Sequence, residues 1–323
     1  MKNAGREVFA ETRAGRKAVP HRLQGATDGI LVPGFGDRHG PVLRAGSRRP
    51  TNWTLRIILP VRALTIPTMT TPPLSLVEIA AHRGASHDAP ENTVASFKLG
   101  WEQGADACEL DIGLTKDGSI VAIHDETTGR TAGVDRNVAE QMLAELRALD
   151  AGSWKGARWT GEKIPTLAEA LATMPDGKRM LIEIKCGPEV LPELERVIRA
   201  SKKLDAQLAI IGFGYETMEQ AKARFPQLAA SWIAEPERGS GGTLPPVAEL
   251  IAKAKAAKLD GLDLSSHFAM DATFVSQVKS AGLKLLVWTV DDPVLARKLT
   301  ALGVDTITTN RPGWLRAQLV AGR

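Results

Sequence analysis

Residues with acid–base and charge-neutralising chemistry occur at the ends of short apolar runs in this chain. The run Ile79–Ala81 leads directly into His82, Arg83 and Gly84. A histidine and an arginine at the end of a buried strand are costly unless other groups pair with them. The two residues could therefore be a buried structural pair or part of a reactive site, and the rest of the chain must decide between these interpretations.

Two further apolar runs place charged residues on one face of a strand. Glu109 and Asp111 are two residues apart, as are Glu183 and Lys185, and this spacing points both side chains to the same side. Neighbouring carboxylates repel each other unless a cation lies between them. Three carboxylates without a cysteine or histidine cluster favour Mg²⁺ or Ca²⁺ over zinc. The alternative is a structural ion-pair network in which Arg83 and Lys185 neutralise the acids.

A second histidine, His124, ends the apolar run Ile120–Ile123. Two histidines can act as a pair, one taking a proton from an attacking oxygen and the other protonating the leaving alkoxide. A divalent cation, Arg83 and Lys185 can neutralise the charge that develops on phosphorus. Together with His82, this combination predicts cleavage of a phosphodiester.

Two aromatic residues at the ends of later apolar runs are weaker candidates for the same site. Phe213 occurs in Ile211-Gly212-Phe213-Gly214, and Trp288 occurs in Val287-Trp288-Thr289-Val290. An aromatic side chain at the end of a strand can contact a substrate, but it can equally belong to the core or the rim. We retain Phe213 and Trp288 as candidates for substrate binding.

Short apolar runs and segments with helical periodicity alternate from residue 77 onward, as is typical of β–α–β units around a parallel sheet. Eight strands with helices between them, across about 245 residues, fit a closed (β/α)8 TIM barrel. A doubly wound open sheet is the alternative, but no Gly-x-Gly-x-x-Gly turn follows the first strand. The strands are expected at residues 77–82, 107–114, 179–185, 207–213, 228–234, 260–265, 284–290 and 304–308. The helices are expected at residues 91–103, 166–174, 190–203, 215–224, 245–257, 271–281 and 292–302.

The interval between the second and third of these strands is too long for a single helix. Lys116–Ser119 is a hairpin signal ahead of the apolar run Ile120–Ile123, and a helix is expected at about 138–149. The sequence therefore predicts a small inserted subdomain after strand 2, at about 114–165. Insertions at this point of a barrel lie over the face that carries active sites.

Positive charge is concentrated in the first part of the chain. The formal net charge is +4, but residues 1–68 hold 12 of the 41 Lys and Arg residues and only four of the 37 acidic residues. The remainder is slightly acidic, which gives no reason to expect a nucleic-acid partner. Residues 1–73 lack sustained periodicity and are expected to be a disordered or spurious N-terminal extension, with Met69 as the favoured start. Residues 74–323 are expected to form the catalytic domain.

The cysteines and the apolar runs bear on where the protein acts. Arg48-Arg49 resembles a twin-arginine export signal, but arginines interrupt the apolar stretch that follows. The two cysteines, Cys108 and Cys186, form neither a disulfide framework nor a zinc spacing, which favours a reducing compartment. The chain also lacks the uncharged apolar run of about 18 residues that a membrane helix needs. We therefore expect a cytoplasmic protein that acts on a small-molecule substrate.

The ordered motifs of the body resemble those of the glycerophosphodiester phosphodiesterases in their bacterial cytoplasmic form. The resemblance runs from about residue 77 to the C-terminus. The matching motifs are His82-Arg83-Gly84, Pro90-Glu91-Asn92-Thr93, Glu109-Leu110-Asp111, Lys116-Asp117-Gly118, His124-Asp125, Arg130-Thr131, Ile164-Pro165-Thr166-Leu167, Glu183-Ile184-Lys185, Trp288-Thr289-Val290 and Gly303-Val304-Asp305.

The resemblance implies a TIM-barrel hydrolase that cleaves glycerophosphodiesters to glycerol 3-phosphate and an alcohol such as choline or ethanolamine. It also implies a divalent cation, Mg²⁺ or Ca²⁺, as cofactor. By the same resemblance, the acid–base pair is His82 and His124, the metal ligands are Glu109, Asp111 and Glu183 with Glu91 as a fourth or outer group, and the phosphate-binding residues are Arg83 and Lys185. The competing interpretations are a phosphodiesterase for lysolipids or phosphoinositides and a barrel that binds phosphodiesters without cleaving them.

Overall fold

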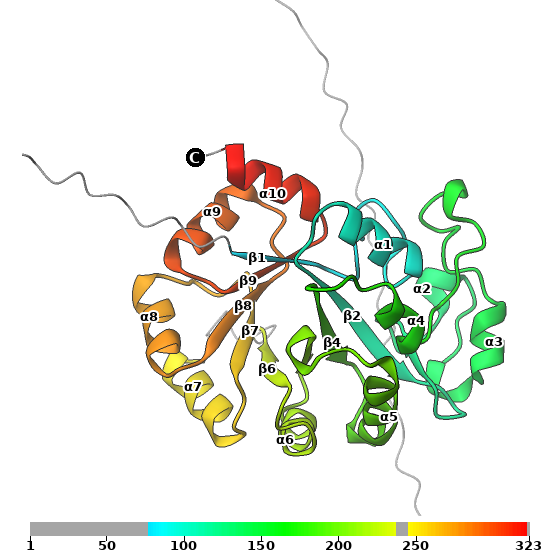
Figure 1. Cartoon of the computed structure of the whole chain (residues 1–323), viewed down its shortest axis with the longest axis horizontal. Coiled ribbons are helices and arrows are strands. Elements are labelled where there is room, and N and C mark those ends of the chain that lie inside the picture. Colours follow the sequence, from blue (N-terminus) through cyan, green and yellow to red (C-terminus); the bar gives the residue numbers. More distant parts are fainter. Residues whose placement is uncertain (1–76, 237–244, 322–323) are drawn as a thin grey trace, which may run out of the picture. The chain divides into compact units, whose positions relative to one another are not determined.

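Eight parallel strands of this computed structural model, which describes residues 77–236 and 245–321, close into a barrel surrounded by helices (Figure 1). Neighbours along the chain are neighbours in the barrel, and β1 pairs with both β2 and β9, which closes the ring. The barrel strands are β1 (Glu78–Ala81), β2 (Ala107–Leu114), β4 (Arg179–Ile184), β5 (Leu208–Gly212), β6 (Ala229–Ala234), β7 (Gly261–Ser265), β8 (Lys284–Trp288) and β9 (Thr306–Thr309). The predicted TIM barrel is confirmed, whereas the prediction for residues 1–73 lies outside the described residues.

The helices around the barrel follow the strands closely. They are α1 (Val94–Glu102), α4 (Leu167–Ala172), α5 (Leu191–Ser201), α6 (Tyr215–Arg224), α7 (Val247–Ala256), α8 (Ala272–Ser280), α9 (Pro293–Leu302) and α10 (Pro312–Ala321). The first helix begins later than predicted, because the Thr93 hydroxyl accepts a hydrogen bond from the Ser96 backbone N–H and caps it. Glu91 therefore lies in the turn before α1. The helix α10 was not predicted from the sequence, although Pro312 in its first turn is a helix-start signal.

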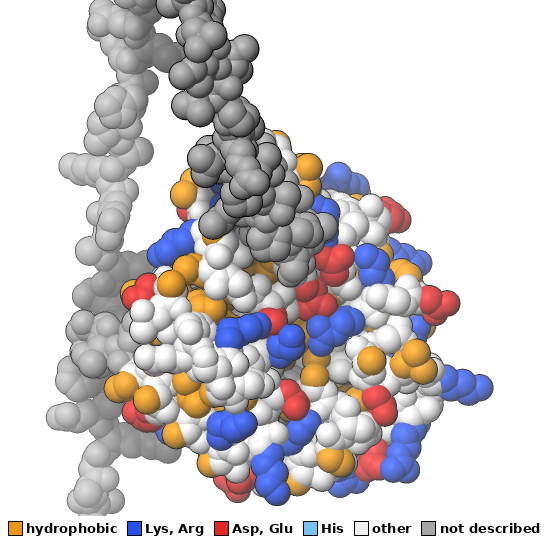
Figure 2. All heavy atoms as spheres, turned by 60° about the vertical axis from the view of Figure 1, so that its left-hand side comes forward, with side chains coloured by type: hydrophobic (Ala, Val, Ile, Leu, Met, Phe, Trp, Pro, Cys, Tyr) orange, Lys and Arg blue, Asp and Glu red, His pale blue; other side chains and the backbone are white. Residues whose placement is uncertain are grey.

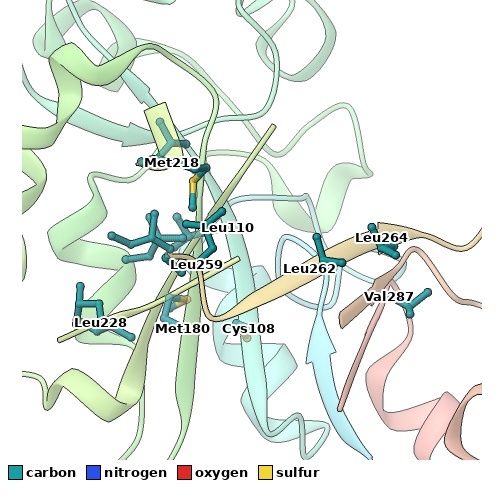
Figure 3. Packing of buried hydrophobic residues seen from close by; sticks show 14 of the residues in the cluster. Cys108, Leu110, Met180, Met218, Leu228, Leu259, Leu262, Leu264 and Val287 are labelled. Atoms are coloured by element: carbon teal, nitrogen blue, oxygen red, sulfur yellow. The ribbon is translucent and has the colours of Figure 1, made fainter. Parts of the chain in front are cut away.

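The strands of the barrel are buried on both faces, so the core has two parts. Outward side chains such as Leu110, Met180 and Leu264 pack against the surrounding helices, together with Met218 of α6 (Figure 3). Inward side chains form a second, smaller apolar cluster, which includes Leu181 and comes mostly from alanine, leucine and isoleucine. Full burial of a leucine contributes about 1.5–3 kcal/mol. This two-sided packing holds the strand ends rigidly, and polar residues stand at their carboxyl ends.

The interval after β2 forms an inserted unit with its own small core. It contains β3 (Ile120–Ala122), which pairs antiparallel with β2, and the short helices α2 (Gly129–Ala132) and α3 (Leu143–Ala148). The predicted single helix at 138–149 is wrong. A 3₁₀ turn ends at Glu140, and Gln141 is extended because its buried side-chain amide donates to backbone carbonyls of residues 136 and 137.

The surface mixes charged and apolar residues. On the face drawn in Figure 2, Lys and Arg side chains of the described residues alternate with Asp and Glu and with scattered apolar groups. Among the described residues, no helix combines the length and the apolarity that crossing a membrane requires. The inserted unit also contacts the barrel loops, since Lys155 Nζ donates to the Ser86 carbonyl at 2.6 Å and Arg158 donates to the Asp88 carbonyl at 2.7 Å.

Gly84 shapes the turn that follows His82 and Arg83. Its φ of +79° lies in the left-handed region, and a Cβ at this position would lie 2.5 Å from the backbone carbonyl carbon of Ser96. The Ser96 hydroxyl in turn donates to the Arg83 carbonyl at 2.8 Å. Only glycine therefore lets the first turn of α1 approach the end of β1 this closely.

We expect Gly84→Ala to destabilise the fold much more than Gly118→Ala. Gly118 has a similar φ of +76°, but a Cβ added there would meet no atom within 4 Å, so its substitution adds only left-handed strain of about 1 kcal/mol. At Gly84 the steric overlap adds to that strain, for a total of roughly 3 kcal/mol. Urea unfolding of both variants measures the difference, and equal losses would show that the close approach is not the constraint.

Candidate active site

Most of the polar residues predicted from the sequence meet at the carboxyl ends of the strands. There they surround a cavity of about 390 Å³. The predicted residues that line it are His82, Arg83, Glu109, His124, Glu183, Lys185, Phe213 and Trp288. Asp111 is fully buried beside Glu109, and Glu91 lies outside the lining. This is the face of a barrel on which active sites are built.

Three buried carboxylates form the centre of the site. Glu109 and Asp111 come from β2, and Glu183 is the register partner of Asp111 on β4. One oxygen of each lies within 4.8 Å of the others. Burial and the charge of Asp111 raise the pKa of Glu183 to about 7, and the same causes raise the pKa of Glu109 well above its ordinary value. The cluster therefore takes up protons unless another cation neutralises it.

The hydrogen bonds of these carboxylates fit a metal site. One oxygen of each is held by a protein donor: Glu109 Oε2 by the Arg83 backbone N–H at 2.9 Å, Asp111 Oδ2 by Asn92 Nδ2 at 2.7 Å, and Glu183 Oε1 by Lys185 Nζ at 2.8 Å. Glu109 Oε1 and Asp111 Oδ1 are buried and have no hydrogen-bond partner among the described residues. Such oxygen-only ligands suit a hard divalent cation.

His82 is held in one tautomer by residues that the sequence analysis missed. Its Nδ1 lies 2.7 Å from Asn310 Oδ1. Asp291 fixes the orientation of that amide, because Asn310 Nδ2 donates to Asp291 Oδ2 at 2.6 Å. The Asn310 oxygen must therefore accept from Nδ1–H, which leaves the lone pair of His82 on Nε2. Burial and the charge of Arg83 lower the pKa of His82 to about 4, so the imidazole is neutral near pH 7.

His124 has charged neighbours at both ring nitrogens. Its Nδ1 lies 2.7 Å from Asp125 Oδ1, and its Nε2 lies 3.2 Å from Lys185 Nζ. A hydrogen bond from Arg130 to Asp125, at 2.6 Å, outweighs partial burial and lowers the pKa of Asp125 to about 2. The ionised Asp125 therefore accepts a hydrogen bond from His124 Nδ1–H, and Lys185, which carries only donors, faces the lone pair on Nε2.

Glu91 joins the two arginines of the site. Its Oε1 accepts from Arg83 Nη1 at 2.7 Å, and Arg130 donates to both of its oxygens at 2.8 Å. Burial opposes ionisation of Glu91, but the hydrogen bond from Arg130 and the charge of Arg83 lower its pKa to about 2. Glu91 lies outside the three-carboxylate cluster. A ligand role for Glu91 stays a prediction, and in this structure it positions Arg83.

Phe213 and Trp288 form an aromatic wall beside Lys185. Their ring centroids are 5.7 Å apart in an edge-to-face arrangement. Lys185 Nζ lies 5.4 Å from the centroid of the Phe213 ring, within reach of a cation–π interaction. The two aromatic residues that the sequence left open between core and site therefore line the cavity.

A family model described as the glycerophosphoryl diester phosphodiesterase family matches residues 82–314 of this chain. A glycerophosphodiester phosphodiesterase of Caldanaerobacter subterraneus is 35% identical over 239 residues, which cover 72% of this chain and 94% of the relative. A Bacillus subtilis protein of the same name is 30% identical over 249 residues, which cover 72% and 83% of the two chains.

Solved structures give the same result. A phosphodiesterase of Oleispira antarctica, solved in complex with the product sn-glycerol-3-phosphate, has a TM-score of 0.68 and 32% identity, covering 75% of this chain and 96% of its own. A glycerophosphodiester phosphodiesterase of Agrobacterium tumefaciens has a TM-score of 0.64 and 25% identity, covering 75% and 100%.

In the presence of a chelator, Glu183→Gln should gain stability relative to the wild type as the pH rises. The pKa of Glu183 rises from 4.5 to about 7 on folding, so the stability that its protonated form contributes is complete below pH 4.5. This contribution is lost as the pH rises through 7, whereas glutamine does not titrate. Urea unfolding should show a relative gain of roughly 1–3 kcal/mol between pH 4.5 and pH 8.

The matched control is Glu249→Gln, which makes the same change at an exposed carboxylate of α7. This control corrects for the general effect of removing one negative charge from the protein. A stability difference between the wild type and Glu183→Gln that does not change with pH would contradict the electrostatic account of the cluster.

Proposed function

The chain belongs to the glycerophosphoryl diester phosphodiesterase family and is a phosphodiester hydrolase, and we propose that it cleaves glycerophosphodiesters to glycerol 3-phosphate and an alcohol. The observation that carries the proposal is a cluster of three buried carboxylates, two of which line the same cavity as His82 and His124. A protein that only binds phosphodiesters would need charged groups to hold the phosphate, but it would not need two imidazoles for proton transfer.

Glu109, Asp111 and Glu183 would hold a divalent cation, Mg²⁺ or Ca²⁺. The cation, when bound, supplies positive charge that polarises the phosphoryl group and stabilises the negative charge of the transition state. Arg83 and Lys185 contribute further positive charge at the same cavity wall. Both already contact the carboxylates, so their side chains are oriented before a substrate arrives.

The environments of the two histidines favour different roles. His82 is neutral and carries its lone pair on Nε2, so it would take the proton from the attacking oxygen. That oxygen belongs either to water or to the substrate's own glycerol hydroxyl, in which case water would open a cyclic phosphate afterwards. His124, once protonated on Nε2, would give that proton to the leaving alkoxide as the phosphorus–oxygen bond breaks, while Asp125 holds Nδ1–H.

The location and the substrate class form part of the same proposal. We propose that the enzyme acts in the cytoplasm, because both of its cysteines are unpaired. We also propose small glycerophosphodiesters as substrates in preference to lysolipids, since most of the residues that line the cavity carry charged or polar side chains.

The purified protein should release glycerol 3-phosphate from glycerophosphocholine and from glycerophosphoethanolamine. Coupled detection of glycerol 3-phosphate measures the reaction, with lysophosphatidylcholine assayed in parallel. Excess chelator should abolish the activity, and Mg²⁺ or Ca²⁺ should restore it. A preference for the lysolipid would reject the substrate class, and full activity in chelator would reject the role of the metal.

His82→Ala and His124→Ala should each lower kcat by roughly 10² to 10⁴, which is the usual contribution of general acid–base catalysis. His87→Ala is the matched control, because the half-exposed His87 ring contacts Asp88 and does not line the cavity. Steady-state kinetics at saturating metal measure the effect. Unchanged turnover in both active-site variants would remove the two-histidine mechanism.

A further inference from the structure

Apart from Arg83 and the carboxylate cluster, two residues that line the cavity carry a buried polar atom without a hydrogen-bond partner among the described residues. These atoms are Asp263 Oδ1, from the middle of β7, and Thr308 Oγ1, from β9. Both residues line the cavity, and each is 2% exposed. Neither stands out in the sequence, and neither is used by the proton transfers or the carboxylate cluster described above.

A structural role does not account for these two groups. Burying a polar group without a partner costs stability, and native proteins rarely retain such groups without a purpose. Thr306 shows the contrast on the same strand, because its hydroxyl donates to Glu78 Oε2 at 2.6 Å. Burial and the charge of Glu183 raise the pKa of Asp263 well above its ordinary value. A neutral carboxyl group both donates and accepts a hydrogen bond, as a hydroxyl ligand requires.

The order of the strands places Asp263 away from two of the carboxylates, whereas Thr308 is on β9, beside β1. In the ring β1-β2-β4-β5-β6-β7-β8-β9, β7 is the fourth strand from β2 in either direction, so Asp263 lies across the barrel from Glu109 and Asp111. A substrate whose phosphate lies near those carboxylates therefore reaches Asp263 with its far end. In a glycerophosphodiester, the constant far end is the terminal hydroxyl of glycerol.

We propose that Asp263 and Thr308 form a subsite that hydrogen-bonds the terminal hydroxyl of the substrate's glycerol, the hydroxyl furthest from phosphorus. This inference rests on the proposed hydrolysis of glycerophosphodiesters and explains why the enzyme would prefer substrates that carry the terminal hydroxyl. The neighbouring cavity residues Ile211 and Ile233 are apolar, so Asp263 and Thr308 present their polar atoms beside an apolar wall. A substrate without the hydroxyl would leave both groups unpaired.

The test compares two substrates that differ only in that hydroxyl: glycerophosphocholine and the phosphocholine diester of propane-1,2-diol. The second substrate keeps the hydroxyl next to the ester carbon, so both routes of attack stay open to it. The wild type should prefer glycerophosphocholine by about 10²-fold or more in kcat/KM, because a site built for a hydroxyl discriminates strongly against its absence.

Asp263→Ala and Thr308→Val should each reduce this preference by about tenfold, mainly by lowering kcat/KM for glycerophosphocholine. Asp263→Asn keeps a donor and an acceptor in the same shape and should retain most of the preference. Thr306→Val, the same change one inward position earlier on β9, is the control and should leave the ratio unchanged. Thermal unfolding verifies that each variant is folded, and Thr308→Val carries the test if Asp263→Ala does not fold.

If the ratio of kcat/KM for the two substrates stays at the wild-type value in Asp263→Ala and Thr308→Val, the proposed subsite is overturned. An equal loss of kcat/KM on both substrates overturns it as well. If Asp263→Asn loses as much preference as Asp263→Ala, the neutral hydrogen-bonding role is overturned. If the wild type cleaves neither substrate, the proposed function fails. Calorimetric binding of glycerol 3-phosphate and of propane-1,2-diol 1-phosphate, to the wild type and to both variants, then decides the subsite separately.

Discussion

The mutual repulsion of three buried carboxylates is the constraint on which the site of this barrel depends. Glu109, Asp111 and Glu183 bring oxygens within 4.8 Å of one another at a depth where water does not screen them. The turn after β1 supplies hydrogen-bond donors that offset this repulsion. Arg83 and Asn92 both adopt left-handed backbone conformations, with φ of 55° and 56°, and through them the turn supplies a backbone N–H and a side-chain amide to two of the acids. The backbone strain of this turn is thus tied to the electrostatics of the site.

A second layer of ion pairs joins this turn to the inserted unit. Glu91 binds Arg130, and Arg130 also binds Asp125, which holds the ring of His124. The hairpin of β2 and β3 contributes as well, because its antiparallel pairing brings the chain back along β2 just before His124. The insertion therefore places the second histidine from two sides, by strand register and by a chain of charges. This dependence explains how His124, a candidate catalytic residue, can lie outside the eight strands and still be fixed in position.

The sequence predicted those features that depend on local spacing. Short apolar runs between helical segments indicated the barrel strands. The two-residue spacing indicated that Glu109 and Asp111 share one face of a strand, as do Glu183 and Lys185. Contacts that form only when the barrel closes could not be predicted from the sequence. Asn310 is 228 residues from His82, and its side chain contacts the His82 ring because β9 pairs with β1. The break at Gln141 depends on side-chain hydrogen bonds to the backbone, which periodicity does not reveal. A single acid in an apolar strand, as at Asp263, has no spacing partner to indicate a role.

The two histidines of the cavity have different partners, which is the basis for proposing different roles for them. Both imidazoles use Nδ1 to contact an oxygen at 2.7 Å, so geometry alone does not distinguish them. The oxygen belongs to a neutral amide at His82 and to an ionised carboxylate at His124. An amide orients the ring of His82 but offers little charge to an imidazolium, and burial beside Arg83 opposes protonation further. At His124 the carboxylate of Asp125 and the ammonium of Lys185 contact the two ring nitrogens instead. In the proposed mechanism, His82 accepts a proton from the attacking oxygen and His124 gives a proton to the leaving alkoxide.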